Sequence, residues 1–236
     1  MPVLQFFHGG GWMLGTVDSA DGICRRLADR GEVIVIAVDY RLAPEHPFPA
    51  AVEDAWSALQ WGGENAPALG GDPSEIGVGG TSAGGNLAAA TAIRSQVFES
   101  PDVARQLLAY PITNHAFDTD SYRENAEGPL LTRADMEWFL EQYLRSPVDG
   151  HNPFASPLRA PPALLDGLAP ATVLTAGFDP LREEGGAYAE RLAEAGVAVD
   201  HRHYPDLSHG FLSFTEESDR ADRAMSEAAR SLRSSI

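Results

Sequence analysis

Short, almost wholly apolar runs alternate with longer amphipathic stretches along the chain, and this alternation limits the fold more than any other feature. Strands that are apolar at nearly every position are typical of a sheet covered on both faces. The runs predict six strands, at residues 3–7, 33–38, 76–79, 107–110, 172–175 and 199–204. The amphipathic stretches predict helices at residues 20–30, 50–61, 83–95, 183–195 and 221–232. This order predicts an α/β fold, with a mostly parallel central sheet flanked by helices.

Residues 111–170 interrupt the alternation, because no run in them predicts a strand. A helix pattern at residues 132–145 begins with Thr132, which can cap it together with Asp135. Several prolines follow between residues 147 and 162. Since a structureless loop of this length is uncommon inside a compact domain, we expect an inserted lid of one or two helices. The chain then makes one domain over residues 1–236, with this lid at about 111–170.

The charge balance excludes several classes of partner. The chain has 34 acidic residues, 17 arginines and no lysine, and its net charge is −17. Such a chain repels phosphate backbones and anionic membrane surfaces, so we expect no nucleic-acid partner. No apolar stretch approaches the ~18 residues that span a bilayer, so we expect no membrane insertion. The use of Arg instead of Lys fits both a GC-rich genome and adaptation to high salt, and the sequence leaves the two open.

The N-terminal residues and the cysteine content favour a cytoplasmic protein. Residues 1–7 lack the basic region of a signal peptide. Cys24 is the single cysteine, which excludes an internal disulfide and a cysteine-based metal site. His201 and His203 lie on a predicted strand without a neighbouring metal-ligand spacing, so we interpret them as surface histidines. We therefore expect no metal and no cofactor.

The strongest local motif is GTSAGG at residues 80–85, which matches G-x-S-x-G. It follows the predicted strand 76–79 and precedes the predicted helix 83–95. In this strand–turn–helix setting the motif exposes a nucleophilic serine, so Ser82 is our candidate nucleophile. A serine hydroxyl is a poor nucleophile near neutral pH and needs a neighbouring base.

Asp179 and His209 are our candidates for the rest of a Ser-His-Asp triad. Asp179 follows the predicted strand 172–175, and His209 follows the last predicted strand. Ser82 follows its own strand in the same way, and the carboxyl ends of parallel strands meet at one edge of a sheet. The chain order, Ser then Asp then His, is the one expected beside a G-x-S-x-G serine.

A glycine run, HGGGW at residues 8–12, follows the first predicted strand. Consecutive glycines let backbone N–H groups approach a ligand without hindrance from side chains. Together with the N–H of Ala83, such donors can stabilise an oxyanion that develops on a substrate. We expect His8 to fix this loop by hydrogen bonding and not to act in catalysis.

Together the motifs resemble the hormone-sensitive-lipase-like group of α/β hydrolases, and most closely its bacterial family IV esterases. They are HGGGW, DYRLAPE at residues 39–45, GTSAGG, DPL at 179–181 and HGF at 209–211, in the family's order over nearly the whole chain. The resemblance implies an α/β-hydrolase fold in which Ser82 is the nucleophile, His209 the general base and acid, and Asp179 the residue that orients His209.

The same resemblance assigns the oxyanion donors. It implies that the N–H groups of Gly10, Gly11 and Ala83 bind the oxyanion, with Gly9 as a substitute for one of them. Thr81 places the chain in the GTSAG branch of the group.

The resemblance departs from the family at the front of the chain. Family members carry several dozen residues before HGGGW, which form part of a helical cap and the first strands, whereas His8 opens the motif here. We expect the predicted strand 33–38 to become an exposed sheet edge, which invites pairing with another chain. A homodimer through that edge is our candidate assembly, and we expect only the lid to cover the site.

The triad and the resemblance predict a carboxylesterase that hydrolyses short- to medium-chain esters of small molecules through an acyl-enzyme. Trp12, Leu181 and Phe211 are our candidates for binding the substrate in an apolar pocket. We find no amphipathic membrane-binding helix, which argues against a long-chain lipase. An amidase or deacetylase with the same triad is the alternative, because both reactions use these motifs. A shortened form with weak or no activity, or a receptor without turnover, also stays open.

Overall fold

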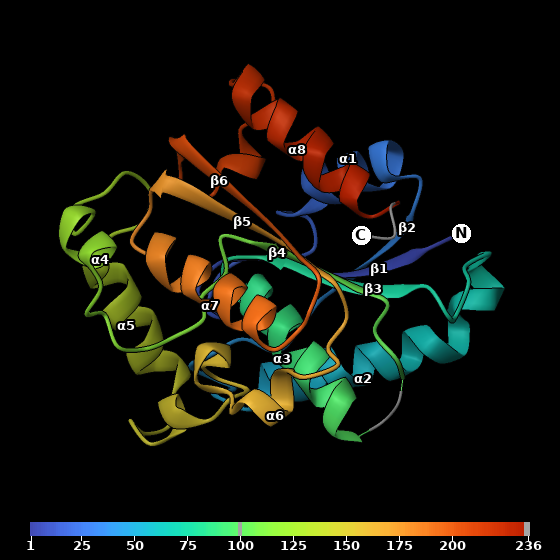
Figure 1. The fold of residues 1–236 in the computed structure, drawn as a ribbon, viewed down its shortest axis with the longest axis horizontal. Helices are drawn as coiled ribbons and strands as arrows, with labels where there is room; N and C mark the ends of the chain where they lie inside the picture. Colours follow the sequence, from blue (N-terminus) through green and yellow to red (C-terminus); the bar gives the residue numbers. More distant parts are fainter. Residues whose placement is uncertain (99–100, 234–236) are drawn as a thin grey trace.

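A computed structural model of the chain describes residues 1–98 and 101–233. At its centre lies a six-stranded sheet in the order β2-β1-β3-β4-β5-β6, in which every neighbouring pair is parallel (Figure 1). The strands are β1 (Val3–Phe7), β2 (Ile34–Val38), β3 (Ile76–Thr81), β4 (Arg105–Ala109), β5 (Ala171–Phe178) and β6 (Val199–Ser208). The predicted α/β architecture with a mostly parallel sheet is therefore confirmed.

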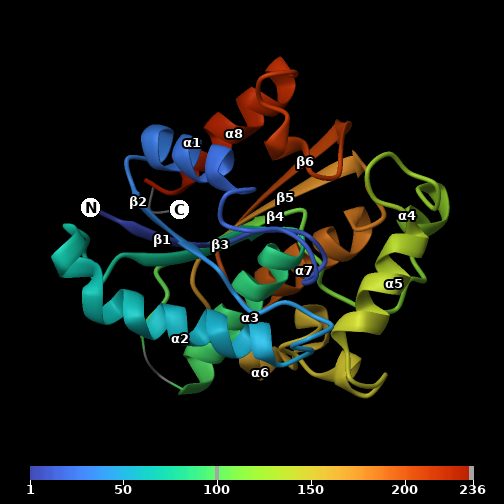
Figure 2. The ribbon, with the colours of Figure 1, turned by 180° about the vertical axis from the view of Figure 1, so that it is seen from behind.

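Helices cover both faces of this sheet. On one face α1 (Asp21–Gly31) and α8 (Asp219–Ser231) lie side by side, and on the other lie α2 (Ala50–Asn65), α3 (Ala83–Phe98) and α7 (Arg182–Glu194) (Figures 1 and 2). The short 3₁₀ helix η1 (Ala66–Leu69) follows α2. The four inner strands bury residues on both sides: in β1, Leu4 faces the α1 and α8 core and Phe7 the opposite core. Burial on two faces explains why the inner strands are mostly apolar.

Residues 111–170 form no strand and leave the sheet between β4 and β5. They hold α4 (Asp120–Glu124), α5 (Arg133–Tyr143), η2 (Asp149–His151), η3 (Pro157–Arg159) and α6 (Pro162–Leu165). Thr132 caps α5 together with Asp135, as the sequence predicts. In Figure 1, α4 and α5 lie at the end of the molecule toward which the arrows of β5 and β6 point. The segment thus has more helices than the one or two expected, and its first half lies by the carboxyl edge of the sheet.

Two strands form the edges of the sheet as described. β2 pairs with β1 alone, and β6 pairs with β5 alone. The four strands between them have neighbours on both sides. Across residues 1–98 and 101–233, no helix has both the length and the apolar character needed to cross a bilayer.

Candidate active site

Ser82 occupies the turn between β3 and α3. Its φ of 55° is left-handed, a conformation that a non-glycine residue adopts only where the surrounding structure imposes it. The Ser82 N–H donates to the carbonyl of Ala109 at 2.9 Å, which fixes the turn against β4. The helix after the turn passes so close to β1 that a Cβ at Gly84 would lie 1.9 Å from the Phe7 carbonyl oxygen. The glycine of the motif is therefore required by this backbone contact.

His209 lies between Ser82 and Asp179. Its Nε2 is 3.0 Å from Ser82 Oγ, and its Nδ1 is 2.8 Å from Asp179 Oδ2. Ser82, Asp179 and His209 directly follow or closely follow β3, β5 and β6, whose carboxyl ends share one edge of the sheet. The structure brings together all three side chains that the sequence analysis selected for a triad.

Asp179 is fully buried, and both of its carboxylate oxygens have partners. Oδ1 accepts the N–H of Leu181 at 2.9 Å, while Oδ2 faces His209. A carboxylate held in this way keeps the Nδ1 side of the imidazole toward itself and the Nε2 side toward Ser82. With the Nδ1 proton on the side of Asp179, Nε2 is free to accept the proton of Ser82.

The glycine run lies against the serine turn. Gly10 has a φ of 115°, and a Cβ there would lie 2.2 Å from the carbonyl oxygen of Leu14, so only glycine fits. The N–H groups of Gly10 and Gly11 donate to no acceptor within the described parts of the chain. Both glycines line the same cavity as Ser82. Two unpaired backbone donors therefore face the space beside the serine.

Ala83 contributes to this region through its backbone alone. It is fully buried, and its side chain does not line the cavity. As the first residue of α3, it has an N–H without an acceptor inside the helix. The helix N-terminus also favours negative charge at this point.

His8 and Tyr40 support the glycine run from behind. Their rings stack with centroids 4.3 Å apart, and the Tyr40 hydroxyl donates to the His8 carbonyl at 2.8 Å. His8 Nδ1 lies 2.8 Å from the Gly9 carbonyl oxygen. Burial lowers the pKa of His8, which favours a neutral ring that donates its Nδ1–H to Gly9. These contacts fit the structural role expected of His8.

A cavity of about 360 Å³ surrounds Ser82 Oγ and His209. Its walls come from the glycine run, the start of α1, the serine turn, the lid and the loop after His209. The lining residues are His8, Gly9, Gly10, Gly11, Gly15, Ser19, Ala20, Ile23, Thr81, Ser82, Tyr110, Leu130, Leu131, Phe139, His209, Gly210 and Ser213. Apolar side chains from the lid therefore face the reactive serine.

The candidate substrate-binding residues Trp12, Leu181 and Phe211 are not among the residues that line this cavity. All three are fully buried. Trp12 turns into the core, where it stacks on Tyr143 with ring centroids 4.0 Å apart. Phe211 packs against Tyr110 at 5.1 Å, and Leu181 lies behind Asp179, to which its N–H donates. These residues lie next to the motifs in the sequence, but that position did not indicate where their side chains point.

Tyr110, Leu131 and Phe139 are among the cavity residues that the sequence analysis did not select. Phe139 lies on α5 above the glycine run, and a Cβ added to Gly11 would lie 2.3 Å from its ring. Tyr110 follows β4 and has a φ of 38°. The helix pattern of α5 is the one sequence feature that points to this wall of the cavity. It does not indicate which residue of α5 faces the cavity, because that depends on the path of the lid.

Metal-ligating side chains are not grouped in the described residues. No cluster of three or more His, Cys, Asp or Glu side chains suited to a metal ion occurs there. His201 Nε2 and His203 Nδ1 both contact Thr175 Oγ1, at 3.0 and 3.1 Å. These two histidines are thus joined through a hydroxyl group.

Comparisons with known proteins show the family of the chain. A family model described as alpha/beta hydrolase fold matches residues 4–213. The chain is similar to carboxylesterase NlhH of Mycobacterium tuberculosis, with 45% identity over 215 residues, covering 91% of this chain and 67% of that protein. It is also similar to carboxylic ester hydrolase LipN of the same species, with 44% identity over 241 residues, covering 100% of this chain and 64% of that protein.

A solved structure shows the same arrangement of the chain. An esterase of Pyrobaculum calidifontis superposes with a TM-score of 0.94 at 44% identity, covering 98% of this chain and 76% of that one. The chain spans about two thirds of the length of the curated relatives. The predicted α/β-hydrolase fold is confirmed, and the chain belongs to the alpha/beta hydrolase fold family.

Proposed function

We propose that this carboxylic-ester hydrolase cleaves short- to medium-chain esters through a covalent acyl-enzyme on Ser82. One observation carries the proposal: Ser82 Oγ, the His209 ring and Asp179 Oδ2 form an unbroken series of contacts of 3.0 and 2.8 Å. Relatives named as carboxylesterases, similar over most of the chain, support the same reaction class.

The reaction begins when Ser82 Oγ attacks the ester carbonyl carbon and His209 Nε2 takes the hydroxyl proton. The tetrahedral intermediate then breaks its bond to the alcohol oxygen, which leaves with the proton from His209. Water then attacks the acyl-enzyme carbonyl and passes a proton to Nε2. The second tetrahedral intermediate breaks its bond to Ser82 Oγ, which takes the proton from Nε2 as the carboxylic acid leaves. Asp179 stays ionised and stabilises the imidazolium without taking its proton.

The oxyanion of each tetrahedral intermediate binds to backbone donors. The N–H groups of Gly10 and Gly11 lie on one side and the N–H of Ala83 lies at the start of α3. Donors fixed before the reaction stabilise the developing charge without reorganisation, and removing one typically costs ~10²–10³ in turnover. The turn at Gly10, with its φ of 115°, supports this role, because the N–H groups of Gly10 and Gly11 have no acceptor in the described parts of the chain.

The size of the cavity supports the choice of esters. About 360 Å³ bounded by Leu130, Leu131 and Phe139 suits a short or medium acyl chain. The motifs, with Thr81 before the nucleophile, support a place in the GTSAG branch of the hormone-sensitive-lipase-like group. The predicted cytoplasmic location stays a prediction.

Hydrolysis of p-nitrophenyl acetate, butyrate, octanoate and palmitate tests the proposal. The wild type is compared with Ser82→Ala and with Ser57→Ala, a matched control on the exposed side of α2. We expect activity on the shorter esters that falls by on the order of 10⁴-fold or more in Ser82→Ala. Ser57→Ala should keep the wild-type rate. A folded wild type no faster than Ser82→Ala would overturn the proposal.

Two further measurements separate the alternatives. A matched p-nitroanilide distinguishes an amidase or deacetylase, because faster cleavage of the anilide than of the ester would replace the proposed substrate class. Faster turnover of palmitate than of butyrate would contradict the short- to medium-chain preference. Both measurements are made on the wild type and need no new variant.

We also propose a homodimer through the β2 edge. Ile34, Val35, Ile36 and Val38 are half-buried on a strand that pairs on one side only in the described sheet. Such an edge offers unpaired backbone groups to a second copy. Size-exclusion chromatography with light scattering over a range of concentrations tests this, and a monomer at every concentration would contradict it.

A further inference from the structure

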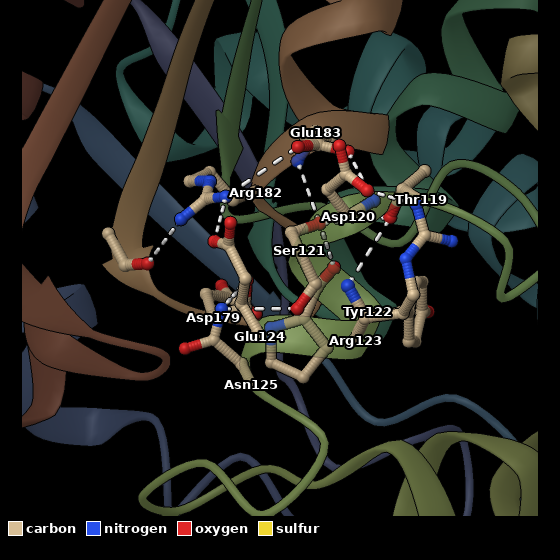
Figure 3. A network of polar contacts seen from close by, with 12 residues as sticks. Thr119, Asp120, Ser121, Tyr122, Arg123, Glu124, Asn125, Asp179, Arg182 and Glu183 are labelled. Carbon is tan, nitrogen blue, oxygen red and sulfur yellow. Dashed lines mark hydrogen bonds and ion pairs between the residues drawn. The ribbon is translucent and has the colours of Figure 1, made fainter.

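The first helix of the lid is bonded to the turn that carries Asp179. Figure 3 shows α4 and the residues after it facing the segment 179–183, although the two are more than fifty residues apart in the chain. Ser121 Oγ donates to the carbonyl of Pro180 at 2.7 Å and accepts the N–H of Glu183 at 3.3 Å. Asn125 Nδ2 lies 3.4 Å from the carbonyl oxygen of Asp179 and 3.1 Å from that of Ser121.

These contacts are buried. Ser121 and Asp179 are fully buried, and Asn125 is 7% exposed. A buried carbonyl that loses its hydrogen-bond donor destabilises the folded state, because the carbonyl is left unpaired away from water. The outer contacts of α4 differ, because the ion pair of Glu124 with Arg182 lies at the surface and contributes little.

The turn that carries Asp179 has a backbone bond of its own, from the Arg182 N–H to the Asp179 carbonyl at 3.2 Å, and it takes further donors from the lid. Asp179 and Pro180 lie between the end of β5 and the start of α7. Pro180 has no N–H, and within the turn the Asp179 side chain uses the N–H of Leu181. The direction of the carboxylate therefore depends on how the backbone of residues 179–181 is held, and two lid side chains bond to that backbone.

Three further hydrogen bonds join the base of the lid to the same stretch. Glu184 Oε1 accepts the N–H groups of Thr113 and Asn114 at 2.6 and 3.1 Å, and Thr113 Oγ1 donates to the Glu184 carbonyl at 2.9 Å. The lid thus contacts residues 179–184 at its root and at α4. The chain between these contacts has little freedom to move away from the turn.

We propose that Ser121 and Asn125 are positioning residues for the acid of the triad: they hold the Asp179–Pro180 backbone so that Asp179 Oδ2 stays on His209 Nδ1. The proposal rests on the proposed role of Asp179 in ester hydrolysis. Neither side chain touches the substrate or the reacting atoms. Their loss tilts the carboxylate away from the imidazole and leaves the cavity wall as it is.

A positioning role predicts a specific change in the kinetic constants. A displacement of about 1 Å in a catalytic group costs up to ~10²-fold in rate. We therefore expect Ser121→Ala and Asn125→Ala to lower kcat on p-nitrophenyl butyrate by about 10-fold or more, with KM within about 2-fold. An interaction that acts on the triad and not on ground-state binding produces this split.

Ser231→Ala is the matched control. Ser231 is also buried, and its Oγ donates to the Ala228 carbonyl at 2.7 Å, but it lies on α8 away from the site. Both serine variants lose a buried hydroxyl donor bond of 2.7 Å, and Ser121→Ala also loses the acceptor of the Glu183 N–H, so its melting temperature should fall at least as far as that of Ser231→Ala. Only Ser121→Ala should lose kcat, and only it should shift or weaken the low-field proton resonance of the His209–Asp179 hydrogen bond.

The outcomes separate this proposal from the proposed function. If Ser82→Ala abolishes activity while Ser121→Ala and Asn125→Ala match Ser231→Ala in kcat and in the proton resonance, the positioning role is overturned and the esterase stands. If the wild type is inactive, the proposed function fails, and the resonance still decides whether α4 holds Asp179 on His209. Should Ser121→Ala not fold, Asn125→Ala carries the same comparison.

Discussion

The phenol ring of Tyr110 lies edge-on to the imidazole of His209, with ring centroids 4.9 Å apart and planes inclined at 63°. The Tyr110 N–H donates to the Leu174 carbonyl at 2.6 Å, which ties this residue to β5 in spite of its φ of 38°. Ser82 and Asp179 fix His209 at its two nitrogens, and Tyr110 packs across the ring. The imidazole is therefore held by contacts on three sides.

Replacing the ring of Tyr110 should reduce turnover. We expect Tyr110→Leu to lower kcat by about 10-fold, because the imidazole loses a packing surface and reaches the reactive geometry less often. Tyr110→Phe keeps the ring and should stay within about 3-fold of the wild type. Steady-state kinetics on p-nitrophenyl butyrate measures both. Equal turnover of the Leu and Phe variants would show that the edge-on contact has no catalytic effect.

Glu184 should make the stability of the fold depend on pH. Burial raises the pKa of Glu184 to about 8, against the bonds from Thr113 and Asn114, which favour its charged form. Between about pH 4.5 and pH 8 the folded state keeps a proton that the unfolded state has released, so the free energy of unfolding falls as the pH rises. The Gln side chain of Glu184→Gln keeps an acceptor for both N–H groups and does not titrate.

Urea unfolding of the wild type and Glu184→Gln at pH 5, 6.5 and 8 measures this effect. Relative to the variant, the wild type should lose up to about 4 kcal/mol of unfolding free energy between pH 5 and pH 8. All other groups titrate equally in both proteins and cancel in the difference. A difference that stays constant with pH would contradict the raised pKa of Glu184.

Two glycine substitutions should change stability in opposite directions. A Cβ at Gly84 would lie 1.9 Å from a backbone oxygen of β1, so we expect Gly84→Ala to destabilise the fold by several kcal/mol, on the order of an overpacked core site. Gly186 lies in α7 with His201 at 3.5 Å, an ordinary contact, so Gly186→Ala should stabilise by about 0.5–1 kcal/mol. Thermal unfolding followed by circular dichroism compares the two. Gly84→Ala melting at the wild-type temperature would disprove the close approach of α3 to β1.

Phe139 and Trp138 are neighbours on α5 with different surroundings. Phe139 lines the cavity over the glycine run, whereas Trp138 is 47% exposed. We expect Phe139→Ala to enlarge the acyl site and to shift the ratio of kcat/KM for octanoate over acetate upward by about 10-fold. Trp138→Ala should leave this ratio unchanged. The same four p-nitrophenyl esters give the measurement, and equal profiles for the two variants would remove Phe139 from the binding site.

The sequence predicted the inner strands of the sheet well because they are buried on both faces. The bounds of β1 match, while β5 and β6 extend beyond the predicted strands to Phe178 and Ser208. The extensions contain Gly177 and exposed polar residues of an edge strand, such as Asp206, which an apolar run does not include. In the lid, α5 was predicted from its cap and periodicity. α4 and α6, with five and four residues, are too short for a periodic pattern.

The sequence predicted the site residues whose location depends on backbone position alone. Ser82, Asp179 and His209 follow their strands, so the parallel sheet brings them to one edge whatever the lid does. The lining of the cavity depends on side-chain direction instead. Trp12 directly follows the glycine run in sequence, yet its φ of 59° turns the indole toward Tyr143 and away from the cavity. Such a turn can be recognised only from coordinates.

The path of residues 111–170 has a consequence for how the enzyme can evolve. The segment leaves the carboxyl edge of β4 and returns to the start of β5, and on the way η3 and α6 pack on α3 and α7. Between the bonded Asn125 and the stacked Tyr143, residues 126–139 carry the cavity-lining side chains of the lid. Because both ends of this short stretch are held, substitutions within it alter the cavity wall without touching the strands, so the lid residues that line the cavity and those that stabilise the sheet lie in different stretches of one chain.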